Sequence, residues 1–222
     1  MAKTRTASTA KVKVTQDLII NKYMDHVLEH GERPATVYAF CKKNEIEEGE
    51  FYQYFGSFEG IREQIWVNLF EHTLKVLSKD KQYPDYANRE KMLSFFYTFF
   101  EMLTANRSYV LFTLKEDRSS LKNLAQLRPL RLKVREYASS LIEESNEKKS
   151  YAISKNPVSI FSEGAWMQLL FLLKYWMDDN SPKFERTDVA IEKSVNVIFD
   201  VFDSTPLESL LDFGKFLFKE RF

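Results

Sequence analysis

The side chains that could perform chemistry are few, and three of them lie early in the chain. His26 and His30 are four residues apart, a spacing at which two imidazoles on one helix can share a metal ion, but no third ligand is nearby. Cys41 is the single cysteine, so the chain cannot form an intramolecular disulfide or a zinc cluster built on cysteines. We expect the two histidines on a solvated helix face and Cys41 in a packing role.

No larger catalytic pattern accompanies these residues. The chain has no glycine-rich phosphate loop, no zinc-spaced His/Glu motif and no nucleophile elbow. Its carboxylates are numerous, but they lie on predicted helix faces with Lys and Arg nearby, as solvated faces do. The sequence therefore predicts no enzyme, no metal site and no cofactor.

Contact with phosphate is the other chemistry that the early residues offer. Lys3, Arg5, Lys11 and Lys13 concentrate positive charge in a polar segment of the first 13 residues. Such an arm could reach phosphate or a DNA minor groove, or it could be a solvated tail.

The elements that would position this arm lie in residues 31–61, which predict two short helices near residues 35–43 and 47–55. Apolar residues recur at helical spacing in both segments and in the turn between them: Val37, Phe40, Cys41, Ile46, Phe51, Tyr54 and Phe55. Two short helices joined by a tight turn form a helix-turn-helix unit, whose second helix enters the DNA major groove. Ser57 offers an N-cap to a longer helix that follows.

The same stretch resembles the DNA-binding domain of tetracycline-repressor-like (TetR) regulators, without a gap from Gly31 to Ile61. The matching residues are Gly31, Thr36-Val37, Ile46, Gly49, Tyr52-Gln53-Tyr54-Phe55, Ser57-Phe58-Glu59 and Ile61. The Tyr-x-Tyr-Phe-x-Ser-x-Glu run is more specific than helical periodicity. The resemblance implies an all-α fold of about nine to ten helices, with a helix-turn-helix head over residues 1–57 and a ligand-binding and dimerisation body over 58–222.

The resemblance also implies which residues of the head contact double-stranded DNA. We expect phosphate contacts from the basic arm and from Thr36, Lys42, Tyr52 and Tyr54. We expect Glu47, Glu48 and Gln53 toward the bases, with Gly49 at the start of the recognition helix.

The head departs from the family pattern in its charge. Glu47-Glu48-Gly49-Glu50 stands where family members usually carry Ser-Lys-Gly-Thr, and Phe58 replaces a phosphate-contacting Lys. Between residues 14 and 60, four basic side chains oppose nine acidic ones. Since non-specific DNA affinity comes from released counterions, we expect weak binding that depends on the basic arm.

The rest of the chain predicts a helical body. We expect a first helix over 15–30, and later ones over 58–77, 89–104, 109–114, 119–147 (kinked or divided at Pro129), 162–178, 185–202 and 207–222. Residues 89–104 are apolar nearly all round, so this helix is expected to be central. Its aromatics and those of later helices predict either a solid core or a cavity for an apolar small molecule or lipid, lined by Phe95, Phe96, Phe99, Phe100, Phe112, Tyr137, Trp166 and Phe171.

The helix predicted over 162–178 has an apolar arc too wide for one core contact. With the amphipathic helix that follows, it predicts a homodimer held by a four-helix interface. The residues expected in that interface are Leu170, Trp176, Val195, Ile198 and Phe202.

Composition and charge agree with a helical protein of the cytoplasm. The 32 basic and 32 acidic side chains cancel, so no global field draws the chain to nucleic acid or to anionic membrane. Aromatics make up 15% of the residues while Gly and Pro number six each, which favours helices around a bulky interior. The absence of an uninterrupted apolar run of about 18 residues argues against membrane insertion.

Two functions follow from the sequence. The leading one is a TetR-like transcriptional regulator, a repressor controlled by an apolar ligand. The alternative is a protein of the same fold that has lost DNA binding and binds a lipid or a protein partner. Residues 175–187 favour this alternative, because they resemble the C-terminal region of ubiquinone-biosynthesis accessory proteins that bind lipids and partner enzymes.

Overall fold

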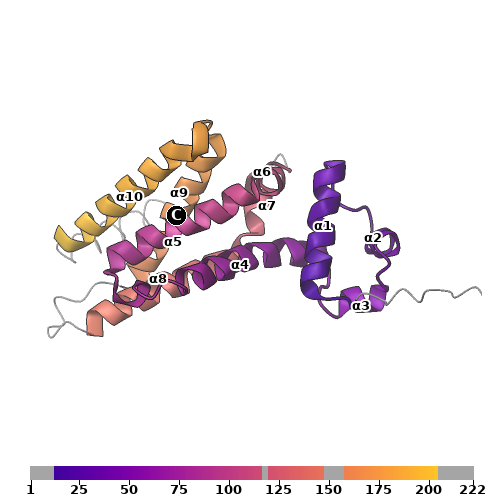
Figure 1. Cartoon of the computed structure of the whole chain (residues 1–222), viewed down its shortest axis with the longest axis horizontal. Helices are drawn as coiled ribbons and strands as arrows, with labels where there is room; N and C mark the ends of the chain where they lie inside the picture. The colour runs from indigo at the N-terminus through magenta and orange to yellow at the C-terminus, as the bar shows by residue number, and fades with distance from the viewer. Residues whose placement is uncertain (1–12, 117–119, 148–157, 205–222) are drawn as a thin grey trace, which may run out of the picture. The chain divides into compact units, whose positions relative to one another are not determined.

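The computed structural model describes residues 13–116, 120–147 and 158–204, and within these ranges the chain forms ten α-helices, two 3-10 helices and no strand (Figure 1). The all-α prediction is confirmed. The chain divides into two compact units, residues 1–62 (the head) and residues 63–222 (the body). The division lies inside helix α4, a few residues after the expected boundary at 57/58.

The head contains α1 (Gln16–His30), α2 (Val37–Lys43), α3 (Glu48–Tyr52) and the first residues of α4 (Phe58–Leu77). Its helix ends are set locally. The Leu18 N–H donates to Thr15 Oγ1 at 3.2 Å, and Gly31 ends α1 with a left-handed backbone at φ 66°. The helix expected over residues 15–30 is therefore confirmed, because an N-cap hydroxyl and a C-terminal glycine act on their own turn.

Aromatic rings form the interior of the head. The Phe58 ring centre lies 5.5 Å from that of Tyr23, 5.6 Å from Phe40 and 5.9 Å from Phe51. Ile46 is buried in the turn between α2 and α3. Phe58, which replaces a family lysine, therefore serves packing.

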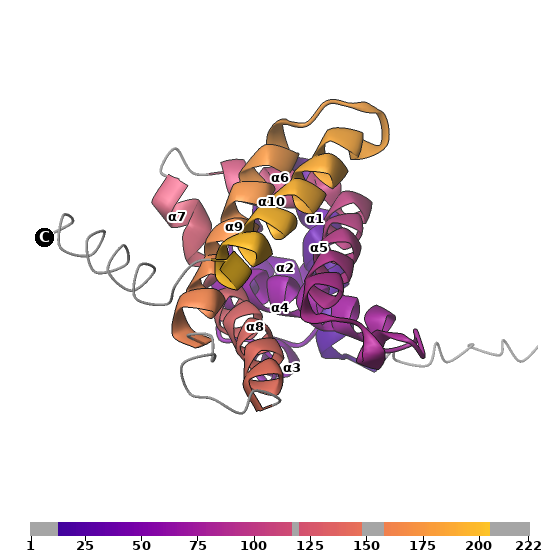
Figure 2. The same cartoon turned by 90° about the vertical axis from the view of Figure 1, so that its left-hand side faces the viewer.

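The body is built from the remainder of α4 and six further α-helices. These are α5 (Asn88–Ala105), α6 (Arg107–Lys115), α7 (Ser120–Ala125), α8 (Arg128–Glu147), α9 (Val158–Asp178) and α10 (Glu185–Ser204), with 3-10 turns η1 (Tyr83–Asp85) and η3 (Pro182–Phe184). Helix α9 packs against α8 and α10, and α10 also packs against α5 (Figure 2).

The helix expected over 119–147 is divided into α7 and α8, as the position of Pro129 predicted. Pro129 is the second residue of α8, where its missing N–H has no intrahelical partner to lose. Helix α9 begins at Val158, four residues before the predicted start. The helix expected over 207–222 lies outside the described residues.

Helix α5 is central to the body. Phe95, Phe96, Phe99 and Phe100 are all buried, and the Phe95 ring stacks on Phe99 at 5.7 Å between ring centres. The prediction that this helix is interior is confirmed. Among the described residues, no helix is both long and apolar enough to cross a membrane.

Candidate functional site

The predicted DNA-contacting residues of α2 and α3 are exposed on the head. Lys42, Glu47, Glu48, Gly49, Tyr52 and Gln53 all present their side chains or backbone to solvent. Thr36 is also exposed, and its Oγ1 accepts the Ala39 N–H at 3.1 Å, so it caps α2. Because the Thr36 hydroxyl acts as an acceptor in this cap, its own proton can still be donated to another group, such as a phosphate oxygen. Lys3, Arg5 and Lys11 lie outside the described residues, and Lys13 is exposed.

Tyr38 is a candidate contact that the sequence analysis missed. Its side chain is 60% exposed, and the Lys42 ammonium lies 5.8 Å from its ring centre, one turn along α2. The apolar stripe of α2 runs through Phe40 and Cys41 instead. The sequence signal that could have revealed Tyr38 is a large aromatic side chain on this helix that lies outside the apolar stripe.

Tyr54, two residues after the end of α3, contacts the segment that precedes α1. Its hydroxyl donates to the Val14 carbonyl at 3.3 Å, across 40 residues of sequence. Tyr54 was expected to contact phosphate, yet its proton is already engaged in this bond. The bond fixes the point at which the basic arm joins the head, directly beside α3.

The three acids of the recognition helix have different roles. The Glu50 carboxylate is half-buried and accepts the Glu47 N–H at 3.2 Å, so it stabilises the first turn of α3. Glu47 and Glu48 have exposed side chains. Their charge faces solvent and any approaching phosphate.

The paired histidines of α1 are used in local contacts. Their rings stack at 4.3 Å, His30 Nδ1 lies 2.9 Å from the His26 carbonyl oxygen, and Lys43 Nζ lies 3.2 Å from His30 Nε2. Burial and the neighbouring His30 and Lys43 lower the pKa of His26. Within the described ranges, no three His, Cys, Asp or Glu side chains are grouped to hold a metal ion.

The aromatic residues expected to line a cavity are brought together in part. Tyr137 joins the four phenylalanines of α5, with its ring centre 4.9 Å from that of Phe95. Trp166 is buried, Phe112 is half-buried, and Phe171 is on the surface. The α5 rings fill space against one another, so the described contacts favour the solid-core alternative at this point.

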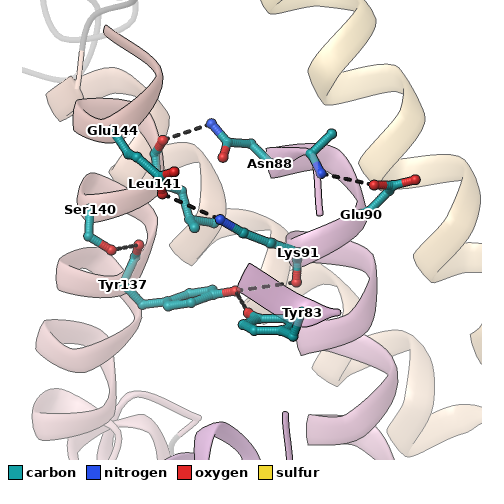
Figure 3. A network of polar contacts seen from close by, with 9 residues as sticks. Tyr83, Asn88, Glu90, Lys91, Tyr137, Ser140, Leu141 and Glu144 are labelled. Carbon is teal, nitrogen blue, oxygen red and sulfur yellow. Dashed lines mark hydrogen bonds and ion pairs between the residues drawn. The ribbon is translucent and has the colours of Figure 1, made fainter. Parts of the chain in front are cut away.

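A polar network closes one end of this aromatic cluster (Figure 3). The Tyr137 hydroxyl contacts the Tyr83 hydroxyl and donates to the Lys91 carbonyl at 3.3 Å, and burial raises the pKa of Tyr137. The buried Lys91 ammonium pairs with Glu144 at 3.3 Å. Asn88 Nδ2 donates to the Leu141 carbonyl at 2.7 Å. With its polar groups paired, this network fixes α5 against α8.

A groove of about 460 Å³ lies where α6, α7 and α9 meet, a volume typical of small-molecule sites. We call it the α6–α7–α9 groove. Its walls are mostly aliphatic, and Lys115, Lys174, Asp178 and Asn123 supply its polar atoms; the apolar residues are Leu114, Leu124, Leu170, Leu173 and Met177. Leu170, expected in a dimer interface, therefore lines this groove.

Helices α9 and α10 present exposed apolar side chains on a shared face. We call it the α9–α10 face; its members are Met167, Phe171, Tyr175, Val189, Val197 and Val201. Between these helices lies a groove of about 410 Å³ that includes Phe171 and Val197. Half-buried Ile198 lies on α10, while the side chain of Phe202 is outside the described set.

Two residues expected in the dimer interface lie inside the chain instead. Trp176 and Val195 are fully buried, and the Trp176 indole donates to Thr104 Oγ1 at 3.0 Å. The Arg107 guanidinium lies 4.4 Å from the Trp176 ring centre and donates to the Trp176 carbonyl at 3.0 Å. Helical spacing alone did not distinguish the inner side of α9 from the outer side.

Comparison with known proteins agrees with this architecture. Residues 91–217, more than half of the chain, match the family model described as the tetracyclin repressor-like, C-terminal domain. A crystal structure from Syntrophomonas wolfei str. Goettingen, assigned to the TetR family of transcriptional regulators, superposes with a TM-score of 0.64 at 17% identity, covering 86% of this chain and 95% of that one. No curated protein matches the sequence. The chain belongs to the tetracycline-repressor-like (TetR) family.

Proposed function

We propose that this protein is a non-enzymatic transcriptional regulator of the cytoplasm that binds double-stranded DNA as a homodimer and is controlled by an apolar ligand. The observation that carries the proposal is the head, a helix-turn-helix in which Tyr54, two residues after the recognition helix α3, donates a hydrogen bond to Val14, the residue that follows the basic arm. The bond holds the chain next to exposed Lys13 close to the end of α3, a helix that has no basic residue of its own.

The basic arm is the source of affinity in this proposal. Glu47 and Glu48 repel phosphate, whereas Lys13 and the three basic residues before it offer counterion release. The folded head positions the protein through Thr36, Tyr38, Lys42 and Tyr52. Two heads in a dimer then select the spacing of two half-sites.

The α6–α7–α9 groove is the ligand site that we propose. Its aliphatic walls suit an apolar body. At its polar side Lys174 is paired with the Asp178 carboxylate, which leaves Lys115 as the excess positive charge. An apolar molecule with one anionic group fits this composition. Ligand that prefers one arrangement of the dimer would shift the protein toward release of DNA, which is the behaviour of a repressor.

One observation favours a second function, a protein of this fold that binds a lipid or a protein partner and not DNA. The folded part of the head carries more acids than bases, which opposes any polyanion. The two functions differ in one measurable quantity, the salt dependence of DNA binding.

A titration with mixed-sequence duplex DNA at two salt concentrations tests the proposal. The intact chain is expected to bind with a steep salt dependence, and deletion of residues 2–12 is expected to remove most of the affinity. Glu48→Lys on α3 is expected to strengthen binding. Glu136→Lys, which makes the same charge change at an exposed site on α8, is the matched control and is expected to have little effect.

Two results would contradict the proposal. Absence of salt-dependent binding by the intact chain would favour the lipid- or partner-binding function. Equal strengthening by Glu48→Lys and Glu136→Lys would show that only net charge matters and that α3 does not face DNA.

A further inference from the structure

The side chain of Gln126 uses its full hydrogen-bonding capacity inside the body. It lies in the turn between α7 and α8 and is buried. Its Oε1 accepts from Trp66 Nε1 at 3.0 Å and from Thr113 Oγ1 at 2.8 Å. Its Nε2 donates to the Thr113 carbonyl at 3.0 Å and to the Asn123 carbonyl at 2.7 Å. A primary amide has two donor hydrogens and two acceptor lone pairs, and all four are used.

These bonds join three segments that are separate in the sequence. Trp66 belongs to α4, Thr113 lies near the end of α6, and Asn123 belongs to α7. Gln126 thus fixes the spacing between α4 and the α6–α7 segment.

The α6–α7–α9 groove lies against the same two segments. Leu114 follows Thr113 directly, and Asn123 and Leu124 line the groove themselves. An occupant that separates the walls of the groove must therefore displace the backbone carbonyls that hold the Gln126 amide.

The amide is expected to follow those carbonyls. Releasing either carbonyl would leave a buried N–H without a partner, which is costly in a dry interior. Movement of the groove wall is therefore expected to displace the Gln126 side chain. That displacement disturbs the hydrogen bond that connects Gln126 to α4, which the Trp66 indole donates.

Trp66 lies on the helix that continues into the head. Helix α4 is unbroken from Phe58 to Leu77, and Trp66 is about one turn beyond Arg62, the last residue of the head. Because α4 is continuous, a displacement or rotation of this helix at Trp66 is expected to extend toward residues 58–62.

We propose that Gln126 is the positioning residue that transmits occupancy of the α6–α7–α9 groove to α4 through the Trp66 indole. This inference rests on the proposed function in taking the groove as the regulatory site. It assigns a role to a buried glutamine that contacts neither ligand nor DNA.

The test places a defined occupant in the groove without relying on ligand affinity. Leu124→Cys, in a chain whose native thiol is removed by Cys41→Ala, is modified with decyl methanethiosulfonate to attach a decyl chain at the groove. Leu132→Cys, at a site 59% exposed on α8 and outside both the groove and the α9–α10 face, carries the same decyl chain as a control. The readout is the ¹H–¹⁵N resonance of the Trp66 indole, assigned by its loss in Trp66→Phe.

The decyl chain at position 124 is expected to shift the Trp66 indole resonance and to speed exchange of its proton, while the decyl chain at position 132 leaves both unchanged. Gln126→Leu is expected to abolish the response. Gln126→Glu is the closest variant in shape: it keeps the acceptor for the indole, but its side chain can donate to at most one of the two carbonyls, and only when protonated. It too is expected to lose the response. An unshifted Trp66 resonance with Gln126 present, or an equal shift in either variant, would overturn the inference.

A DNA titration separates failure of this inference from failure of the proposed function. The chain at position 124 is expected to change affinity for a mixed-sequence duplex by about five-fold or more, and Gln126→Glu is expected to bring that factor close to one. If the decyl chain shifts the Trp66 resonance but leaves the DNA affinity unchanged, the regulatory role of Gln126 is refuted. If no form of the protein binds DNA, the proposed function fails, and the indole measurement still decides whether Gln126 transmits the change.

Discussion

The most direct prediction concerns the α9–α10 face, which we propose as the dimer interface. Phe171 is 56% exposed on this face, and its ring centre lies 6.3 Å from that of Tyr175. Phe171→Asp replaces an exposed apolar side chain, so it removes little packing inside the chain. In a dimer with a two-fold axis the same residue occurs on both sides of the interface, so one substitution changes the interface at two places.

The size of the effect follows from the exposed part of the side chain. Complete burial of a Phe side chain contributes up to about 3 kcal/mol. A little more than half of Phe171 is still exposed, so its burial in a dimer contributes about 1.5 kcal/mol per copy and about 3 kcal/mol per dimer. Loss of that contribution alone weakens dimerisation by roughly 100-fold, and two desolvated carboxylates weaken it further.

Sedimentation equilibrium measures the dissociation constant, and circular dichroism checks that each variant is folded. Phe171→Asp and Val197→Asp are expected to be folded monomers at concentrations where the native chain is a dimer. Leu132→Asp is the matched control, because Leu132 is 59% exposed on α8, away from the face. A native chain that is monomeric at micromolar concentration would refute the reasoning, and so would a Phe171→Asp dimer as tight as the native one.

Two further predictions concern single hydrogen-bonded groups. Burial would raise the pKa of the Asp179 carboxyl, but hydrogen bonds from Ser181 and Thr187 outweigh it and hold the pKa at about 2, below the ordinary 3.8. Because the pKa of Asp179 is lower in the folded state, the ionised carboxylate stabilises the fold fully above pH of about 4, and this stabilisation is lost as pH falls toward 2. Asp179→Asn is therefore expected to lower the free energy of unfolding by about 2 kcal/mol at pH 7 and by less at pH 3. Urea unfolding at both pH values measures this, and an equal difference at both would contradict it. Tyr54→Phe removes the hydroxyl that donates to Val14 and is expected to weaken DNA binding of the intact chain; an equal loss in the chain lacking residues 2–12 would show that the bond does not act through the arm.

The features that could be predicted from the sequence depend on neighbouring residues. Thr15, Thr36 and Ser57 accept backbone N–H groups three residues ahead, and Gly31 ends α1, because capping is decided within one turn. The central position of α5 was also predictable, since a helix apolar on all sides has no stable place at the surface.

The features that could not be predicted depend on which side of a helix faces the core. Phe171 and Trp176 are five residues apart on α9, about 140° around the helix axis, so they face different surroundings. Both belong to one wide apolar arc, and periodicity gives its width without its direction. The fold places Trp176 inside and Phe171 outside, which reverses the roles expected for them as interface residue and ligand wall.

The unusual charge of the head separates into a structural part and a functional part. Phe58 packs against three aromatic rings, and Glu50 accepts the Glu47 N–H, so both departures from the family pattern are used by the fold itself. Replacing them would disturb the head whether or not it binds DNA. Glu47 and Glu48 have exposed side chains. The choice between a DNA-binding head and a partner-binding head therefore depends on whether the basic arm outweighs these two carboxylates.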